Sequence, residues 1–203
     1  MKPRKAGKRY TLLTYRHSMS RLWTATLLLG LVLAAAGGWS WFSGTPLISW
    51  DVETWLLVGS GVCLAFSLFA FLARGMAYVQ AYADHLRLVT PFLKLRISYR
   101  RMIRVHPASV QQLFPPLEAG WAQRRFLEPF FGETAVVIEL TSFPLAPALL
   151  RLFLPSMMFL HQTNGLVLLV PDWMAFSTEL DSFQGAWLQM QGRRVQAGRL
   201  ARG

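Results

Sequence analysis

The chain has 203 residues, of which 53% are hydrophobic and only 15% are charged. In an average soluble protein about 25% of the residues are charged. A disordered chain is excluded, because a chain as apolar as this one would leave too much apolar surface in water. The net charge is +11, from 21 Lys and Arg against 10 Asp and Glu. A single cysteine, Cys63, excludes an internal disulfide framework and a cysteine-cluster metal site.

The apolar residues are concentrated in two uninterrupted runs. No charged residue occurs from Leu22 to Trp50, and none occurs from Thr54 to Ala73. As a helix, residues 22–42 would extend over about 31 Å at about 1.5 Å per residue, which is close to the thickness of a bilayer's hydrocarbon core, about 30 Å. We therefore expect transmembrane helices over residues 22–42 and 55–74, joined by a short external loop over residues 43–54.

Basic residues flank these runs on one side only. Seven Lys and Arg residues precede the first run and Arg74 follows the second, whereas the loop contains Asp51 and Glu53 but no Lys or Arg. Positively charged flanks stay in the cytoplasm. The sequence thus predicts a hairpin in the cytoplasmic (inner) membrane with both termini cytoplasmic, and residues 1–21 form a basic cytoplasmic N-terminus.

A cleaved signal peptide is the competing interpretation of the first run. A basic start, an apolar stretch and the small residues at 34–36 before Gly37 are typical of such a signal. However, a basic lead of 21 residues is long for a signal, and the apolar run continues through Trp39, Trp41 and Phe42. These two features favour a retained membrane helix.

After the second run, the pattern changes to short alternating stretches that are typical of β-strands. Such stretches cover residues 78–82, 85–90 and 94–99, and residues 102–105 either close the third stretch or begin a turn. The stretch Thr134–Thr141 is rich in β-branched residues and predicts a further strand.

The last part of the chain predicts a β-hairpin and then a helix. Asn164-Gly165 separates apolar runs at residues 158–162 and 166–170, and Asn-Gly in that position is a strong hairpin signal. From Phe176 onward the apolar residues recur with the period of a helix, for which Ser177 or Thr178 is a candidate cap. Residues 192–203 form a basic tail that we expect to fray.

This order of elements predicts an α+β fold. The alternating stretch that begins at Tyr78, directly after two membrane helices, and the basic stretch from Leu95 to Val105 resemble the bacterial pleckstrin-homology-like family in its membrane-anchored form. The resemblance implies an antiparallel β-sandwich or barrel with a C-terminal amphipathic helix over residues 76–191. Two proline-containing stretches, residues 106–132 and 143–157, depart from a minimal version of that fold; the second either touches the bilayer or packs on the domain as a short helix.

No motif of known catalytic chemistry is present. The sequence has no phosphate-binding Gly-rich loop and no His-x-x-x-His or Cys-x-x-Cys pair, so we expect no catalytic residue, no metal and no cofactor. Asp84 beside His85 resembles a catalytic base with the carboxylate that orients it, although a turn aspartate that bonds its own backbone explains it more simply. A membrane enzyme with a site in residues 106–132 is a remaining alternative.

Basic side chains crowd one part of the domain without any acidic neighbour: Lys94, Arg96, Arg100, Arg101 and Arg104. If the strand continues, Lys94, Arg96 and Arg100 share one face and Arg101 points away from it. This face is either an ordinary solvated surface or a binding surface for anionic lipid headgroups or a phosphorylated ligand.

The sequence therefore favours a non-catalytic binding or scaffolding module at the inner leaflet. The expected partners are the membrane itself, its anionic headgroups, and a protein partner or a second copy of the chain. Nucleic acid is not expected, because no nucleic-acid-binding motif accompanies the basic residues. An accessory subunit of a larger membrane complex, with the domain as its docking surface, is the alternative.

Overall fold

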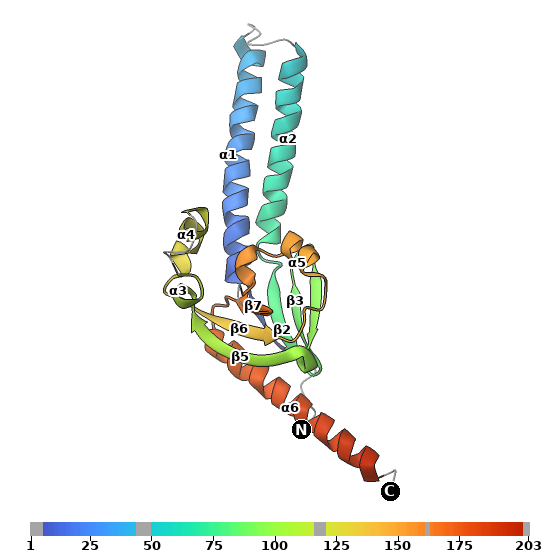
Figure 1. Cartoon of the computed structure of the whole chain (residues 1–203). Helices are drawn as coiled ribbons and strands as arrows, with labels where there is room; N and C mark the ends of the chain where they lie inside the picture. Colours follow the sequence, from blue (N-terminus) through green and yellow to red (C-terminus); the bar gives the residue numbers. More distant parts are fainter. Residues whose placement is uncertain (1–5, 44–49, 116–120, 161–162, 201–203) are drawn as a thin grey trace. The chain divides into compact units, whose positions relative to one another are not determined.

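The structure is a computed structural model, and it describes residues 6–43, 50–115, 121–160 and 163–200. The chain divides into two compact units. One, here called the helical hairpin, comprises residues 15–76. The other, here called the β domain, combines the chain up to Thr14 with the chain from Ala77 onward. Helices and antiparallel sheets are both present, so the expected α+β class is confirmed (Figure 1).

The β domain contains two antiparallel sheets. The first has four strands in the order β1 (Ala6–Thr11), β2 (Tyr78–Tyr82), β3 (His85–Val89) and β4 (Lys94–Ser98). A 3-10 turn, η1 (Tyr99–Arg101), leads to the second sheet, which has the order β5 (Met102–Ser109), β6 (Thr134–Leu140) and β7 (Gly165–Leu168). Strands β2, β3, β4 and β6 lie where the alternating and β-branched stretches predicted them.

Strand β1 lies in the segment that we expected to be only a basic N-terminus. It pairs with β2, with Thr11 opposite Tyr78 and Arg9 opposite Gln80. The side chains of Tyr10 and Leu12 are buried in the domain. With only these two core residues beside exposed basic ones, the short strand has no clear alternation in the sequence. Residues 1–5 of the expected N-terminus lie outside the described residues.

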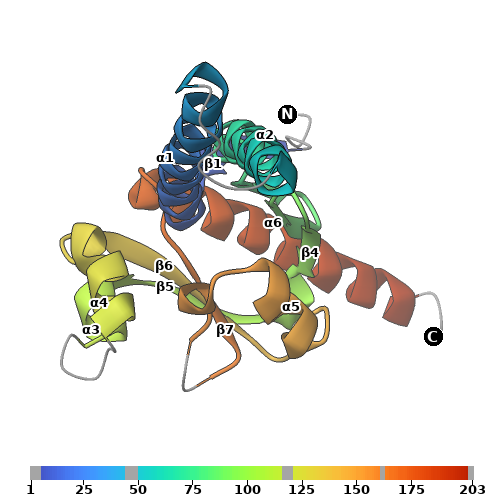
Figure 2. The same cartoon turned by 90° about the horizontal axis from the view of Figure 1, so that it is seen from above.

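Helix α6 (Trp173–Leu200) is the C-terminal helix that the sequence predicted, but it begins earlier. The Oδ1 atom of Asp172 accepts a hydrogen bond from the backbone N–H of Ala175 at 3.0 Å, so Asp172 caps the helix in place of Ser177 or Thr178. Phe176 and Leu180 are buried against the sheets. Both views show the helix running past the sheets toward the C-terminus (Figure 1, Figure 2), so the expected frayed tail is helical as far as Leu200.

The two irregular stretches contain short helices. In the first, β5 extends to Ser109 and is followed by α3 (Val110–Leu113), α4 (Trp121–Leu127) and η2 (Glu128–Phe130). Residues 116–120 lie outside the described residues. The stretch forms an apolar cluster with β6, β7 and the segment after β7, and the buried members of that cluster are Val110, Phe114, Leu127, Phe130, Ala135, Val167 and Leu169.

The second stretch contains α5 (Pro147–Phe153) and η3 (Ser156–Met158). Helix α5 buries Leu150 and leaves Leu149 and Leu152 exposed. It therefore packs on the domain as a short helix, which is one of the two alternatives that the sequence left open. The strand predicted at residues 158–162 is wrong over its described part, because Phe159 forms only an isolated bridge with Leu166. Residues 161–162 lie outside the described residues.

Two long helices form the helical hairpin, α1 (Leu13–Ser43) and α2 (Trp50–Ala73). Helix α1 begins nine residues before the predicted span, directly after β1, because the polar residues from Arg16 to Arg21 continue the helix on the domain side. Helix α2 begins five residues before the second predicted span and ends at Ala73, one residue before its predicted end. Residues 44–49 of the expected external loop lie outside the described residues.

Candidate membrane anchor and basic surface

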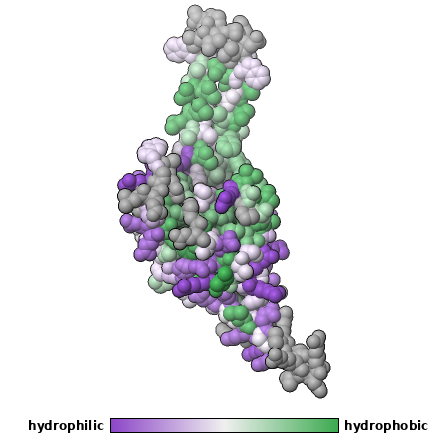
Figure 3. Space-filling model, in the orientation of Figure 1, coloured by the Kyte–Doolittle hydropathy of each residue, from purple (hydrophilic) through white to green (hydrophobic). Residues whose placement is uncertain are grey.

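The helical hairpin carries its apolar side chains on the outside. Leu13–Trp39 and Glu53–Ala73 are long and apolar enough to cross a membrane, and only 11% and 22% of their most apolar windows are buried within the structure. Hydrophobic residues cover the visible face of the hairpin (Figure 3). In the core helix of a soluble protein most of such a window would be buried. The exposed apolar surface therefore suits a lipid environment, where it needs no cover.

The seam between α1 and α2 is made of small and hydroxyl-bearing residues. The hydroxyl of Ser60 donates to the backbone carbonyl of Gly30 at 2.9 Å, and that of Ser67 donates to the carbonyl of Trp23 at 3.0 Å. A Cβ atom added at Gly30 would lie 3.1 Å from the Leu64 side chain, so glycine allows this close approach. Small residues and interhelical hydrogen bonds are the usual means by which helices associate in lipid.

Aromatic and basic side chains gather at the end of the helical hairpin that adjoins β1 and β2 along the chain. The rings of Trp23 and Phe71 make an edge contact with centroids 5.5 Å apart. The Arg74 guanidinium lies 3.9 Å from the centroid of the Phe71 ring. At the other end, Trp39 and Trp55 are exposed. Aromatic belts at both ends and cations at one are typical of a membrane helix pair with a defined orientation.

Helix α6 clamps β1 onto the β domain through Glu179. Its two carboxylate oxygens accept hydrogen bonds from the backbone N–H of Lys8 at 3.0 Å and from the hydroxyl of Tyr10 at 2.9 Å. The Gln80 side-chain amide donates to the carbonyl of Gly7 at 2.7 Å. The β1–β2 ladder is irregular between Ala6 and Arg9, so these side chains satisfy backbone groups that the ladder leaves unpaired.

This clamp also shifts the titration of Tyr10. Burial, the hydrogen bond to Glu179 and the negative charge of that carboxylate raise the pKa of Tyr10 to about 12. A shallow hollow of about 610 Å³ lies over the clamp and contains Lys8, Asp172 and Glu179. Both of its carboxylates already serve the fold, Asp172 as the helix cap and Glu179 in the clamp.

Strand β1 bears directly on the signal-peptide interpretation. Cleavage near Gly37 would remove β1 together with α1, and the sheet would lose an edge strand, the buried side chains of Tyr10 and Leu12, and the partner of Glu179. A segment that supplies a paired strand to the mature domain must stay attached to it. The structure thus favours a retained first span.

Strand pairing defines two ends of the β domain. Thr11, Tyr78, Val89 and Lys94 lie in one row across the first sheet. This row marks the connection end, where β1 leads into α1 and the chain from α2 enters β2. The backbone N–H of Leu13 donates to the carbonyl of Leu169 at 2.9 Å, so the segment after β7 lies at this end too. The opposite end, where β4 leads through η1 into β5, is here called the far end.

The five predicted basic residues are all exposed, but they do not form one face. Lys94 and Arg96 lie on the outer face of β4, with Arg96 opposite Arg87 of β3. The expectation that Arg100 shares this strand face is wrong, because the strand ends at Ser98. Tyr99 turns inward there, and its hydroxyl donates to the backbone carbonyl of Tyr82.

The other three basic residues lie elsewhere. Arg100 and Arg101 lie in η1 at the far end, and the guanidinium of Arg101 donates to the carbonyl of Phe143 at 3.3 Å. Arg104 belongs to the second sheet, where it is opposite Glu139. Sequence reasoning missed Arg87, which was visible only as a single basic residue in an alternating strand.

The Asp84 and His85 side chains are hydrogen-bonded to each other, and among the described residues no hydroxyl or thiol is hydrogen-bonded to the His85 ring. The Asp84 carboxylate and the Nδ1 atom of His85 are 2.7 Å apart, and the imidazole stacks on the Tyr82 ring with centroids 5.0 Å apart. Ser98 is the register partner of His85, yet its hydroxyl accepts from the backbone N–H of Arg100 at 3.4 Å and caps the η1 turn. The first two contacts lie at the turn between β2 and β3, and the third lies at the start of η1 after β4.

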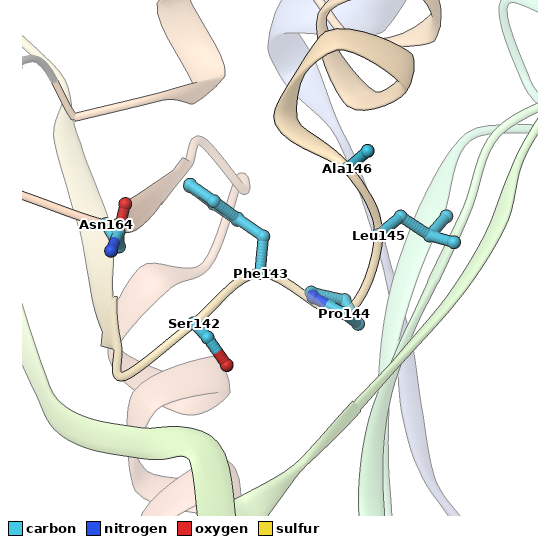
Figure 4. Close-up of a pocket in the computed structure, with 6 residues that line it drawn as sticks. All are labelled: Ser142, Phe143, Pro144, Leu145, Ala146 and Asn164. Carbon is cyan, nitrogen blue, oxygen red and sulfur yellow. The ribbon is translucent and has the colours of Figure 1, made fainter.

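A second shallow pocket, of about 480 Å³, lies beside α5 (Figure 4). It is lined by Ser142, Phe143, Pro144, Leu145, Ala146 and Asn164. None of these six side chains titrates in the physiological range, so the pocket offers a hydroxyl and an amide for hydrogen bonding but no general acid or base.

The molecule was compared with protein-family models, curated proteins and solved structures, and nothing matches it.

Proposed function

We propose that the protein is a membrane-anchored binding module, in which the helical hairpin crosses the cytoplasmic membrane and holds the β domain at the inner leaflet. One observation carries the proposal: the helical hairpin is inserted between β1 and β2, which are paired in one sheet. Paired strands lie on the same side of a membrane, so the chain must return to the side that it left. Arg16, Arg21 and Arg74 flank the spans on that side and favour the cytoplasm.

The order of elements supports a pleckstrin-homology-like architecture for the β domain. Two antiparallel sheets followed by a C-terminal helix are the elements that the sequence resemblance implies. In this proposal the helical hairpin is an insertion within the domain, between its first and second strands. Two short connections then tether the domain, which restricts its distance from the bilayer more than a single connection would.

We place the anion-binding surface on the outer face of β3 and β4, formed by Arg87, Lys94 and Arg96. Lys94 and Arg96 are exposed, and among the described residues no carboxylate lies within 4.0 Å of the Lys94 or Arg96 charge. A basic residue close to an anionic leaflet contributes about 1 kcal/mol. Tethering raises the local lipid concentration and makes such weak contacts effective.

A soluble form of the β domain tests this surface. Because Thr11 and Tyr78 are register partners, residues 15–76 can be replaced by a short Gly-Ser linker that joins Thr14 to Ala77. This domain should sediment with vesicles that contain phosphatidylglycerol at low salt and should be released at high salt, as screened charges require. The double variant Lys94→Glu with Arg96→Glu should lose this binding.

The matched control is the double variant Arg100→Glu with Arg101→Glu, which changes the net charge equally but at the far end. It should retain most of the binding. Equal loss in both variants would show that net charge alone is responsible, and equal binding by both would return the face to an ordinary solvated surface.

An accessory subunit that docks a protein partner is the second candidate, and α6 favours it. The ring of Trp187 makes its edge contact with Tyr99, at 6.2 Å between centroids, and the apolar side chains of Leu188 and Met190 beyond it are exposed. A stoichiometric protein recovered with the full chain from native membranes in mild detergent, and lost on Leu188→Asp substitution, would establish this role.

A further inference from the structure

Two exposed aromatic side chains, one in a turn of the first sheet and one on a helix that follows the second sheet, lie at the same end of the β domain. Phe92 lies in the turn between β3 and β4, with 55% of its surface exposed, and Trp121 begins α4, with 75% exposed. A single exposed aromatic ring is ordinary on a protein surface, but these two rings lie at one end of the domain. Their common position requires a physical reason.

The position of the Phe92 turn is fixed by strand register and by two backbone hydrogen bonds. Thr90 and Leu93 exchange two backbone hydrogen bonds at 2.8 and 3.3 Å, which leaves Pro91 and Phe92 as the two residues at the tip. Polar or glycine residues normally occupy a two-residue hairpin tip. The strands that the turn joins contribute Val89 and Lys94 to the row that marks the connection end.

Helix α4 lies at the connection end by independent contacts. In the second sheet, Ser109 and Thr134 are partners at the end of β5 from which α3 and α4 continue. Leu127 of α4 belongs to the apolar cluster against which Leu13 packs. Trp121 is six residues before Leu127 on the same helix, which is about 9 Å along its axis.

A basic residue accompanies each ring, near in sequence to Phe92 and in contact with Trp121. Lys94 is exposed two residues after Phe92, and the Arg125 guanidinium lies 5.4 Å from the centroid of the Trp121 ring. Arg124, next to Arg125, is exposed as well. Aromatic rings with adjacent Lys or Arg are typical of the headgroup layer of a bilayer, where the ring enters the interface and the cation meets phosphate.

The length of the connection brings this end within reach of the membrane. The apolar run of α2 ends at Ala73 and β2 begins at Tyr78. Five residues of fully extended chain cover at most about 18 Å, and turn hydrogen bonds from Gly75 and Met76 back to Leu72 and Ala73 shorten the distance further.

We infer that the β3–β4 turn and the start of α4 form a bilayer-contact surface, in which Phe92 and Trp121 enter the headgroup layer beside Lys94 and Arg125. The inference deepens the proposed function and rests on it. The two contacts, together with the helical hairpin, hold the β domain in one orientation on the leaflet, so that its far end faces the cytoplasm.

Site-specific fluorescence quenching in the full chain tests this orientation. Cys63→Ser removes the single cysteine, and a fluorophore is then attached to Phe92→Cys or Trp121→Cys in vesicles of roughly two parts phosphatidylcholine to one part phosphatidylglycerol. Leu188→Cys is the matched control, because Leu188 is 56% exposed. It follows Trp187, the residue of α6 that contacts Tyr99 at the far end. Only variants that unfold in urea at the same midpoint as the Cys63→Ser parent are compared.

Headgroup nitroxide lipids should quench the labels at positions 92 and 121 several-fold more than the label at 188, and aqueous iodide should show the reverse order. Equal quenching at all three positions would overturn the inference. Protection from iodide without nitroxide quenching would also overturn it, because a protein would then cover the surface. A fourth label, at Leu31→Cys, separates the two levels of failure: if lipids with a nitroxide in the acyl chain do not quench it, the membrane anchor itself is wrong.

Discussion

The helical hairpin and the β domain use the same apolar residues in opposite ways. In the β domain, Leu86 and Phe176 are completely buried, and basic side chains such as Lys94 and Arg96 are exposed. In the helical hairpin, glycine and serine occupy the interior while leucines such as Leu31 face outward. If the helical hairpin spans the membrane as proposed, burial alone does not identify a core, because the surrounding solvent decides which side chains must be covered.

The largest expected effect is the loss of a buried ring in the β domain. Phe176→Ala should lower the free energy of unfolding by about 3–5 kcal/mol, because it leaves a cavity between α6 and the sheets. Chemical unfolding of the full chain in mild detergent, followed by tyrosine and tryptophan fluorescence, measures this loss. A decrease below about 1 kcal/mol, typical of surface positions, would mean that α6 is not packed as described.

The comparison becomes sharper with two leucines that are equally exposed. Leu31 in the helical hairpin is 51% exposed and Leu188 in the β domain 56%. Leu31→Arg should oppose membrane insertion by about 2.5–3.5 kcal/mol, since it places a charge near the centre of the first span. Leu188→Arg should change stability by no more than about 0.5 kcal/mol. The measurement is the fraction of each variant that is recovered in membranes. Equal recovery of the two variants would mean that Leu31 and Leu188 do not face different solvents.

Because Tyr10 donates to Glu179, the β domain should lose stability at alkaline pH, when the Tyr10 phenol loses its proton. Because the pKa of Tyr10 is raised from 10.0 to about 12 in the folded state, folding favours the protonated phenol. This contribution is complete below pH 10 and disappears as the pH rises through about 12. Tyr10→Phe should cost about 1.5–3 kcal/mol at neutral pH, the range for hydrogen bonds to charged groups.

The same variant should show a smaller loss of stability between pH 10 and pH 12 than the wild type. Urea unfolding of the soluble β domain at a series of pH values measures both effects. Burial also raises the pKa of Tyr99, so part of the alkaline loss should remain. An unchanged pH profile in Tyr10→Phe would show that the clamp does not control this titration.

The smallest expected effect concerns the helical seam. Gly30→Ala places a methyl group 3.1 Å from the Leu64 side chain, whereas a Cβ atom at Gly61 meets nothing within 4 Å. Gly30→Ala should therefore leave the seam about 1 kcal/mol weaker than Gly61→Ala does, the low end of overpacking costs, because both variants gain the same helix propensity. The melting temperatures of the two variants in detergent measure this difference. A lower melting temperature for Gly61→Ala than for Gly30→Ala would mean that the two helices meet through another face.

Most of the fold was predictable where one local pattern decided the structure. The uncharged run over Thr54–Ala73 predicted α2, and alternation predicted β2, β3 and β4, because each pattern needs only its own residues. Strand β1 was not predictable, since it depends on Gln80 and Glu179, which are distant in sequence. The apolar cluster in residues 106–132 was missed for the same reason.

The basic surface shows where sequence reasoning about the site failed. Even spacing of Lys94, Arg96 and Arg100 predicted a shared face, but the inward turn of Tyr99 separates Arg100 from the other two. Arg87 joins the surface only through register with Arg96. Spacing along one strand thus located part of the candidate surface, and cross-strand pairing supplied the rest.

The central claim is that the helical hairpin crosses the membrane and returns the chain to the side on which β1 pairs with β2. Fusing a reporter that is active only outside the cytoplasm tests it most directly, with the reporter inserted at Ser43 in one protein and attached after Gly203 in another. The account predicts export of the Ser43 reporter and cytoplasmic retention of the Gly203 reporter. A Ser43 reporter that stays in the cytoplasm would contradict it.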